Sequence, residues 1–318
     1  MISKQYIHEN DILDSWLYES FHIMNDIHDC ENRILAMECE LGEKQFFKED
    51  TSDFIAYMES EKKGIFEKIG KKIIELTESF LEATRKILEK IRTALFGVKK
   101  MTTDEKYLKM MENDPEFAKK FKESVLNGSI DLKDFKDINT LIDEADKISK
   151  EFLSGKMDVK NYEKIMDDKL DKYANRAKNI TAILALAGSA ATVYKAYKTL
   201  NDNTEEAIKC RQRLGTMRDN AKRAAELSAM NDGVSDNRLA AYARYHKELM
   251  NITARNTSAL GKLTDKFYGF IIKHNSKEMV GTSKTVNTDF TYNDNKTDQE
   301  EFGTTKNRSF TYGKSGNR

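Results

Sequence analysis

Proline is almost missing from this chain, which has one proline and 15 glycines in 318 residues. Turn-rich all-β proteins, collagen-like chains and Pro-rich linkers need far more of these two residues, so those classes are excluded. What remains is a helix-rich chain. It is long enough to bury a core and, at about 150 residues per domain, to form two domains.

Reactive and metal-binding residues are also scarce. Cys30, Cys39 and Cys210 are odd in number and lack C-x-x-C spacing, so we expect free structural thiols and neither a disulfide framework nor a zinc site. His22 and His28 are not four residues apart, as helical metal ligands would be. No nucleophile-elbow, P-loop or dinucleotide-binding glycine motif is present. We therefore expect no catalytic, metal or cofactor site and no enzymatic activity.

A net charge is missing as well, because 53 basic residues balance 53 acidic ones. This balance excludes a uniformly basic nucleic-acid binder. It does not hold locally: residues 1–61 carry a net charge of −11, 62–100 of +6, 101–172 of −4 and 173–277 of +9. Such segments can neutralise each other within one chain, dock onto other copies, or present separate faces to different partners.

The first region, residues 1–100, contains two predicted amphipathic helices. The first covers residues 11–41 and has an acidic outer face, and Gly42 is expected to end it. Its apolar positions are Ile12, Trp16, Phe21, Ile23, Ile27, Ile34, Leu35 and Leu41.

The second predicted helix, over residues 62–96, has the clearest periodicity. Its apolar positions alternate steps of three and four, as in a coiled-coil seam: Phe66, Ile69, Ile73, Leu76, Phe80, Ala83 and Ile87. Its other side is rich in cations, with Lys63, Lys68, Lys71, Lys72, Arg85, Lys86, Lys90 and Arg92. This side is either the solvated face of a bundle helix or a contact surface for phosphates or anionic lipids.

The second region, residues 101–172, contains a 13-residue repeat, at 126–138 and 153–165. Each copy predicts a glycine that ends one helix, an aspartate that caps the next, and an apolar residue that packs on an aromatic at the fourth helical position. These residues are Gly128, Asp131, Ile130 and Phe135 in one copy, and Gly155, Asp158, Met157 and Tyr162 in the other. Neither copy has the oxygen ligands of a calcium loop.

The third region, residues 173–277, is basic and includes an uncharged segment at 179–194. As a helix this segment would be about 24 Å long, shorter than a bilayer core requires. It is either a buried core helix or a segment that enters membranes on a trigger. The candidate residues for both roles are Ile180, Ile183, Leu184, Leu186 and Val193.

The last region, residues 278–318, is too polar to build a core and is expected to be a flexible tail. Asp289–Tyr292 and Ser309–Tyr312 repeat a Phe-Thr-Tyr pattern. The repeat fits a strand added to a partner's sheet edge, or a chance similarity in a disordered tail. The candidate docking residues are Phe290, Tyr292, Phe310 and Tyr312.

The predicted fold is all-α: an elongated multi-helix bundle with long amphipathic helices and a flexible polar C-terminal tail. The acidic helix, the run Lys62–Ile74 and the ending Leu95-Phe96-Gly97 together resemble structural proteins of large tailed bacteriophages that infect low-GC hosts. The resemblance covers about the first 100 residues. It implies a capsid-associated virion component, made in the host cytoplasm, with no catalytic residues.

The expected function is therefore that of a non-enzymatic structural or packaged virion protein. Its expected partners are other virion proteins or copies of itself, with DNA contact through the basic faces also open. One alternative is a membrane-active helical protein that inserts residues 180–193. Another is a host-encoded oligomeric scaffold that assembles through the seam. The first residues show no secretory signal.

Overall fold

The computed structural model describes residues 3–102, 105–127, 130–186, 192–230 and 238–279. Within these ranges helices are joined by turns and loops, and the β-structure is limited to an isolated bridge between Lys133 and Asn179, so the predicted all-α class is confirmed. The helices are α1 (Ser3–Phe46), α2 (Ser52–Met101), α3 (Glu105–Glu112), α4 (Pro115–Val125), α5 (Phe135–Leu153), α6 (Val159–Arg176), α7 (Ile180–Leu186), α8 (Thr192–Met230) and α9 (Arg238–Met279).

Residues 1–276 form one compact unit, which contains almost all of the three helical regions expected from the sequence. Residues 277–318 form a second unit. The four aromatic residues of the tail repeat, Phe290, Tyr292, Phe310 and Tyr312, lie outside the described residues.

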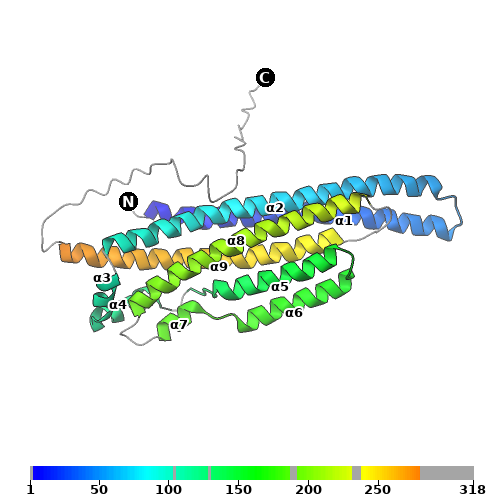
Figure 1. Cartoon of the computed structure of the whole chain (residues 1–318). Coiled ribbons are helices and arrows are strands. Elements are labelled where there is room, and N and C mark those ends of the chain that lie inside the picture. The colour runs from blue at the N-terminus through cyan, green and yellow to red at the C-terminus, as the bar shows by residue number, and fades with distance from the viewer. Residues whose placement is uncertain (1–2, 103–104, 128–129, 187–191, 231–237, 280–318) are drawn as a thin grey trace, which may run out of the picture. The chain divides into compact units, whose positions relative to one another are not determined.

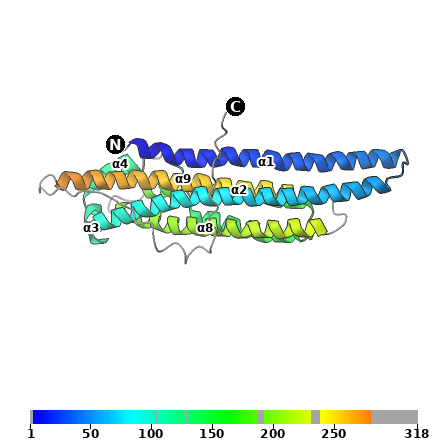
Figure 2. The same ribbon diagram turned by 90° about the horizontal axis from the view of Figure 1, so that it is seen from above.

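Helices α1 and α2 run side by side as an antiparallel hairpin, joined by a short turn (Figures 1 and 2). With 50 residues, α2 is about 75 Å long. All seven predicted seam positions of α2 are buried, as are Ile91 and Leu95 beyond them. The ring of Trp16 on α1 meets Phe80 on α2 edge-on, with ring centroids 5.4 Å apart. The periodic seam is therefore the core face of α2.

Both helices of this hairpin are longer than the sequence predicts. Gly42 does not end α1, which continues to Phe46. Helix α1 stops where Lys48 adopts the left-handed conformation, with φ 58°, and the amide of Glu49 donates back to the carbonyl of Lys44 at 3.0 Å. A glycine inside a helix costs about 1 kcal/mol, and the packing of the helix onto α2 offsets that cost.

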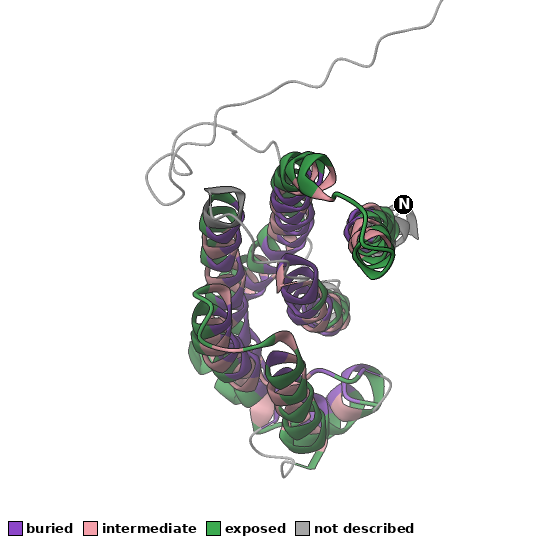
Figure 3. Cartoon of the chain, turned by 90° about the vertical axis from the view of Figure 1, so that its right-hand side faces the viewer, coloured by how far each residue is buried: buried purple, intermediate pink, exposed green. Residues whose placement is uncertain are grey.

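Helix α9 contacts most of the other helices in the unit. Its His246 lies against Thr77 of α2, and its Tyr242 donates a hydrogen bond to the Met217 carbonyl of α8 at 2.8 Å. Aromatic contacts also join neighbouring helices. Phe267 of α9 meets Phe121 of α4, and Tyr245 of α9 meets Tyr162 of α6. Tyr162 in turn stacks on Phe152 of α5. In Figure 3 the buried faces of the helices turn toward their neighbours.

The capping expected from the 13-residue repeat holds in one copy and is wrong in the other. Asp158 caps α6, since its carboxylate accepts a hydrogen bond from the amide of Asn161 at 2.8 Å. In the first copy the helix begins three residues later, with Asp134 as the N-cap in place of Asp131. The residues between them are held extended, because Leu132 accepts a hydrogen bond from Ile180 at 2.7 Å. Phe135 is therefore the first helical residue and not the fourth.

Helices α2 and α8 approach each other closely at Gly70. A Cβ atom added there would lie 2.7 Å from the Cβ of Ala225, whereas one added at Gly64, on the same helix, would meet nothing within 4 Å. We expect Gly70→Ala to lower the free energy of unfolding by about 1 kcal/mol, because the overpacking exceeds the helix-propensity gain of alanine. Gly64→Ala is expected to raise it by about 0.5 to 1 kcal/mol.

Chemical denaturation of both variants measures this difference. Adding Ala225→Gly to the Gly70→Ala chain removes the clash and should recover the lost stability, with a coupling energy of at least about 0.5 kcal/mol. A Gly70→Ala variant as stable as the Gly64→Ala variant would show that α2 and α8 do not approach at this point.

Candidate functional site

The eight cations predicted as a phosphate or lipid contact all lie on α2, and they are exposed or half-buried. Four of them pair with carboxylates of this chain at 2.7 to 3.6 Å: Lys72 with Asp26 and Glu75, Arg85 with Glu82 and Glu89, Lys86 with Glu82, and Arg92 with Glu205. The hydrogen bond between Lys72 and Asp26 raises the pKa of the lysine and lowers that of the aspartate. At least half of this basic face is therefore neutralised locally.

Acidic and basic segments also pair between helices. On the α1–α2 hairpin, Lys62 binds Glu38 at 2.9 Å and Arg33 binds Glu61 at 2.9 Å. From α8, Arg218 reaches Glu78 of α2 at 3.2 Å. Pairs at the surface contribute at most about 1 kcal/mol each, so they define which faces meet more than they stabilise the fold.

The outer face of α1 carries exposed aromatic side chains. The sequence places Phe21 and Leu35 on the apolar stripe of this helix, but both are exposed. Tyr18 is also exposed, and its ring packs edge-on against His22 at 4.4 Å. Helix α1 packs mainly against α2, so the residues on its opposite side face solvent.

A denser aromatic group lies where α1 turns into α2, which we call the hairpin tip (residues 46–57). Phe46 is 80% exposed, Phe47 70% and Tyr57 55%, while Phe54 is half-buried. The rings of Phe46 and Phe47 meet edge-on at 5.3 Å. The sequence analysis did not single out these residues. The feature of the sequence that marks this segment is its density of aromatic residues, with four in the twelve positions 46–57.

Charges surround the aromatic rings of the hairpin tip. Residues 38–61 carry eight acidic and two basic side chains, and two of the acidic ones, Glu38 and Glu61, pair with Lys62 and Arg33 outside this range. Lys44 lies over the ring of Phe54 at 5.4 Å and pairs with Glu49 at 3.5 Å. Among the described residues, Lys48 is the one non-glycine residue with a positive φ. The hairpin tip therefore presents apolar rings inside an acidic rim.

The uncharged segment 179–194 does not form the single helix that its length predicts. It is divided between α7 and the start of α8, and residues 187–191 lie outside the described residues. Ile180, Leu184 and Val193 are buried in the helical core, whereas Ile183 and Leu186 are exposed. Across the part of the chain that the structure describes, every helix is too short or too polar to pass through a bilayer.

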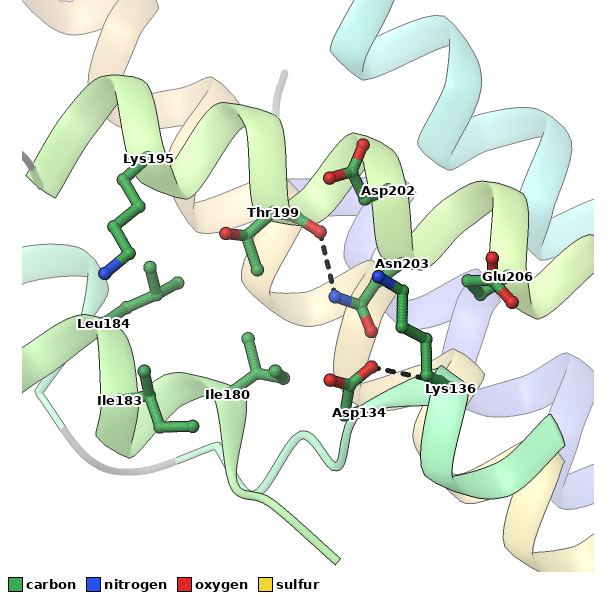
Figure 4. A pocket seen from close by; sticks show the side chains of 10 residues that line it. All are labelled: Asp134, Lys136, Ile180, Ile183, Leu184, Lys195, Thr199, Asp202, Asn203 and Glu206. Atoms are coloured by element: carbon green, nitrogen blue, oxygen red, sulfur yellow. Dashed lines mark hydrogen bonds between the residues drawn. The ribbon is translucent and has the colours of Figure 1, made fainter. Parts of the chain in front are cut away.

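A shallow pocket of about 260 Å³ lies between α7, α8 and the start of α5 (Figure 4). Ile180, Ile183 and Leu184 form its apolar side. Two of its polar side chains bond within the chain: Asp134 accepts from the amide of Lys136 at 3.0 Å, and Asn203 donates to the Thr199 carbonyl at 2.9 Å. In the described residues no group of three or more histidine, cysteine, aspartate or glutamate side chains could hold a metal ion.

The three cysteines are free thiols, as expected. Cys30 and Cys210 are buried, and burial raises the pKa of both thiols, which keeps them protonated. Cys39 on α1 is exposed. Cys39 is therefore the accessible thiol of the three.

Comparison of the chain with protein-family models, with curated proteins and with solved structures finds no match.

Proposed function

We propose that this chain is a non-enzymatic structural protein of a virion and that it acts through protein–protein contacts made at the hairpin tip. The observation that carries the proposal is the exposure of Phe46, Phe47 and Tyr57 together on one tip. Clustered exposed aromatic residues are typical of surfaces that bind other proteins, because Phe and Tyr contribute much of the binding free energy when they become buried.

The rest of the hairpin supports this role because it holds the tip rigidly. The Trp16–Phe80 contact in the core seam and the ion pair of Lys62 with Glu38, nearer the tip, fix α1 against α2. A rigid element loses little conformational entropy on binding, so more of the contact energy appears as affinity.

The virion assignment is supported by the resemblance of residues 1–100 to phage structural proteins. Contact with DNA through α2 has less support, since Lys72, Arg85, Lys86 and Arg92 already bind carboxylates of the same chain. Phosphates would have to compete with those carboxylates.

Mass spectrometry of purified particles from the source tests the proposal. We expect the intact chain in the particles, at a copy number comparable with that of other structural proteins and resistant to a high-salt wash. Its absence from particles while it is abundant in the lysate would overturn the virion assignment.

A further inference from the structure

Another exposed aromatic residue lies near the opposite end of α2, in basic surroundings. Phe96 is 69% exposed, and Lys99 and Lys100 beside it are exposed as well. From residue 90 to residue 100 the chain carries four basic residues and no acidic one, and of these Arg92 pairs with Glu205 of α8. This group, which we call the basic end, matches the hairpin tip in chemistry but has the opposite charge.

Phe96 is held outward by close packing on the other side of α2. A Cβ atom at the neighbouring Gly97 would lie 3.0 Å from the ring of Tyr268, so α9 covers that side of the helix. Arg92 pairs with Glu205 of α8 at 3.6 Å. Lys99 and Lys100 are in the last turn of α2, where the helix C-terminus favours cations. The basic end is thus a fixed feature of the bundle surface.

The hairpin tip and the basic end cannot meet within one molecule. Tyr57 of the tip and Phe96 of the basic end lie near opposite ends of α2, 39 positions apart. At 1.5 Å per residue this is about 58 Å. An acidic aromatic surface and a basic aromatic surface on a rigid rod can therefore combine only between two copies.

We infer that the hairpin tip of one copy docks on the basic end of a second copy, so that the chain assembles head to tail. The inference rests on the proposed function and identifies the protein that the hairpin tip binds as a second copy of the same chain. The acidic rim of residues 38–61 faces Lys99 and Lys100 of the next copy, and the exposed rings bury one another. The contact joins two different surfaces, so an open assembly keeps one unused surface at each of its two ends, where further copies can add until the assembly closes into a ring.

Sedimentation velocity of the full-length chain from about 1 μM to about 500 μM tests the inference. We expect the mean mass to rise steadily with concentration and to fall as salt is added, because the contact pairs opposite charges. Phe46→Ser with Phe47→Ser should weaken association at least about tenfold, and Phe96→Ser with Lys99→Glu should do the same. Phe21→Ser, another exposed aromatic on α1, is the matched control and should leave association unchanged.

Mixing the two defective variants gives the sharpest result. The Phe46/Phe47 variant keeps its basic end and the Phe96/Lys99 variant keeps its tip, so each is monomeric alone and the mixture should form one-to-one dimers and nothing larger. A mixture that stays monomeric overturns the head-to-tail contact. So does a wild-type chain that remains monomeric throughout, or variants that associate as well as the wild type.

Two other results separate this inference from the proposed function. Binding of the wild-type chain to neutral phosphatidylcholine vesicles, lost in the Phe46/Phe47 variant, would assign the tip to lipid and overturn both proposals about protein contact. A monomeric chain that is nevertheless present in purified particles would overturn the head-to-tail contact and leave the virion assignment intact.

Discussion

Replacing Phe80 with alanine is expected to lower the free energy of unfolding by about 3 to 5 kcal/mol. The Phe80 side chain is fully buried in the seam of α2, where its ring contacts Trp16. Removing it leaves a cavity at the place where α1 docks, and the lost contacts include the aromatic pair. Urea denaturation of the variant and the wild type measures the change.

Phe96 provides a matched control for this substitution on the same helix. Its ring is mostly exposed, so Phe96→Ala is expected to change the stability by less than about 0.5 kcal/mol. Trp16 is the one tryptophan of the chain, and its fluorescence reports directly on the α1–α2 contact. Equal stability losses for Phe80→Ala and Phe96→Ala would contradict the assignment of the seam to the core.

Acid is expected to destabilise the chain through His246. This side chain is buried on α9, and its Nε2 lies 3.0 Å from the Thr77 hydroxyl. That hydroxyl donates to the Ile73 carbonyl at 2.8 Å, so Nε2 must carry the proton and donate to it. Nδ1 is buried and has no hydrogen-bond partner. Protonation at Nδ1 would place an uncompensated charge in the core, and burial accordingly lowers the pKa of His246 to about 4.

The sign of the pH effect follows from this lowered pKa. Between pH 6.5 and pH 4 the unfolded chain binds a proton at this histidine and the folded chain does not. The stabilisation is therefore complete above pH 6.5 and is lost as the pH falls toward 4, by about 3 kcal/mol in total.

Unfolding free energies measured in urea at pH 7 and pH 4.5 test the effect. His246→Gln keeps an N–H donor for Thr77 but does not titrate, so its stability should fall less over this interval than that of the wild type. Because both chains contain the same carboxylates, the difference between their pH dependences removes the contribution of carboxylates that titrate in this interval. An identical pH dependence in the two chains would exclude His246 as the cause.

Most of the helical core can be predicted from the sequence, because the spacing of apolar residues along a helix determines which of its faces is buried. A helix that buries one face repeats its apolar residues every three or four positions, and the α2 seam from Phe66 to Ile87 follows that repeat strictly. Asp114 is the N-cap and Pro115 the first residue of α4, in keeping with the preference of proline for the first helical turn.

Predictions fail where contacts distant in sequence decide the local structure. Asp131 has the sequence of a cap, but backbone pairing between Leu132 and Ile180 moves the helix start to Asp134. Phe21 and Leu35 are apolar yet exposed, since α1 packs mainly against one neighbour. The hairpin tip could not be predicted for the same reason, because nothing in Phe46 or Phe47 indicates that no other helix covers them.

Hydrogen–deuterium exchange at low and high protein concentration tests the head-to-tail contact most directly. The contact predicts that amides of residues 46–57 and of residues 92–100 both exchange more slowly at the higher concentration. Helix α6, which lies outside both surfaces, should exchange at the same rate in both samples. Exchange that does not depend on concentration at the hairpin tip and at the basic end would contradict assembly through these surfaces.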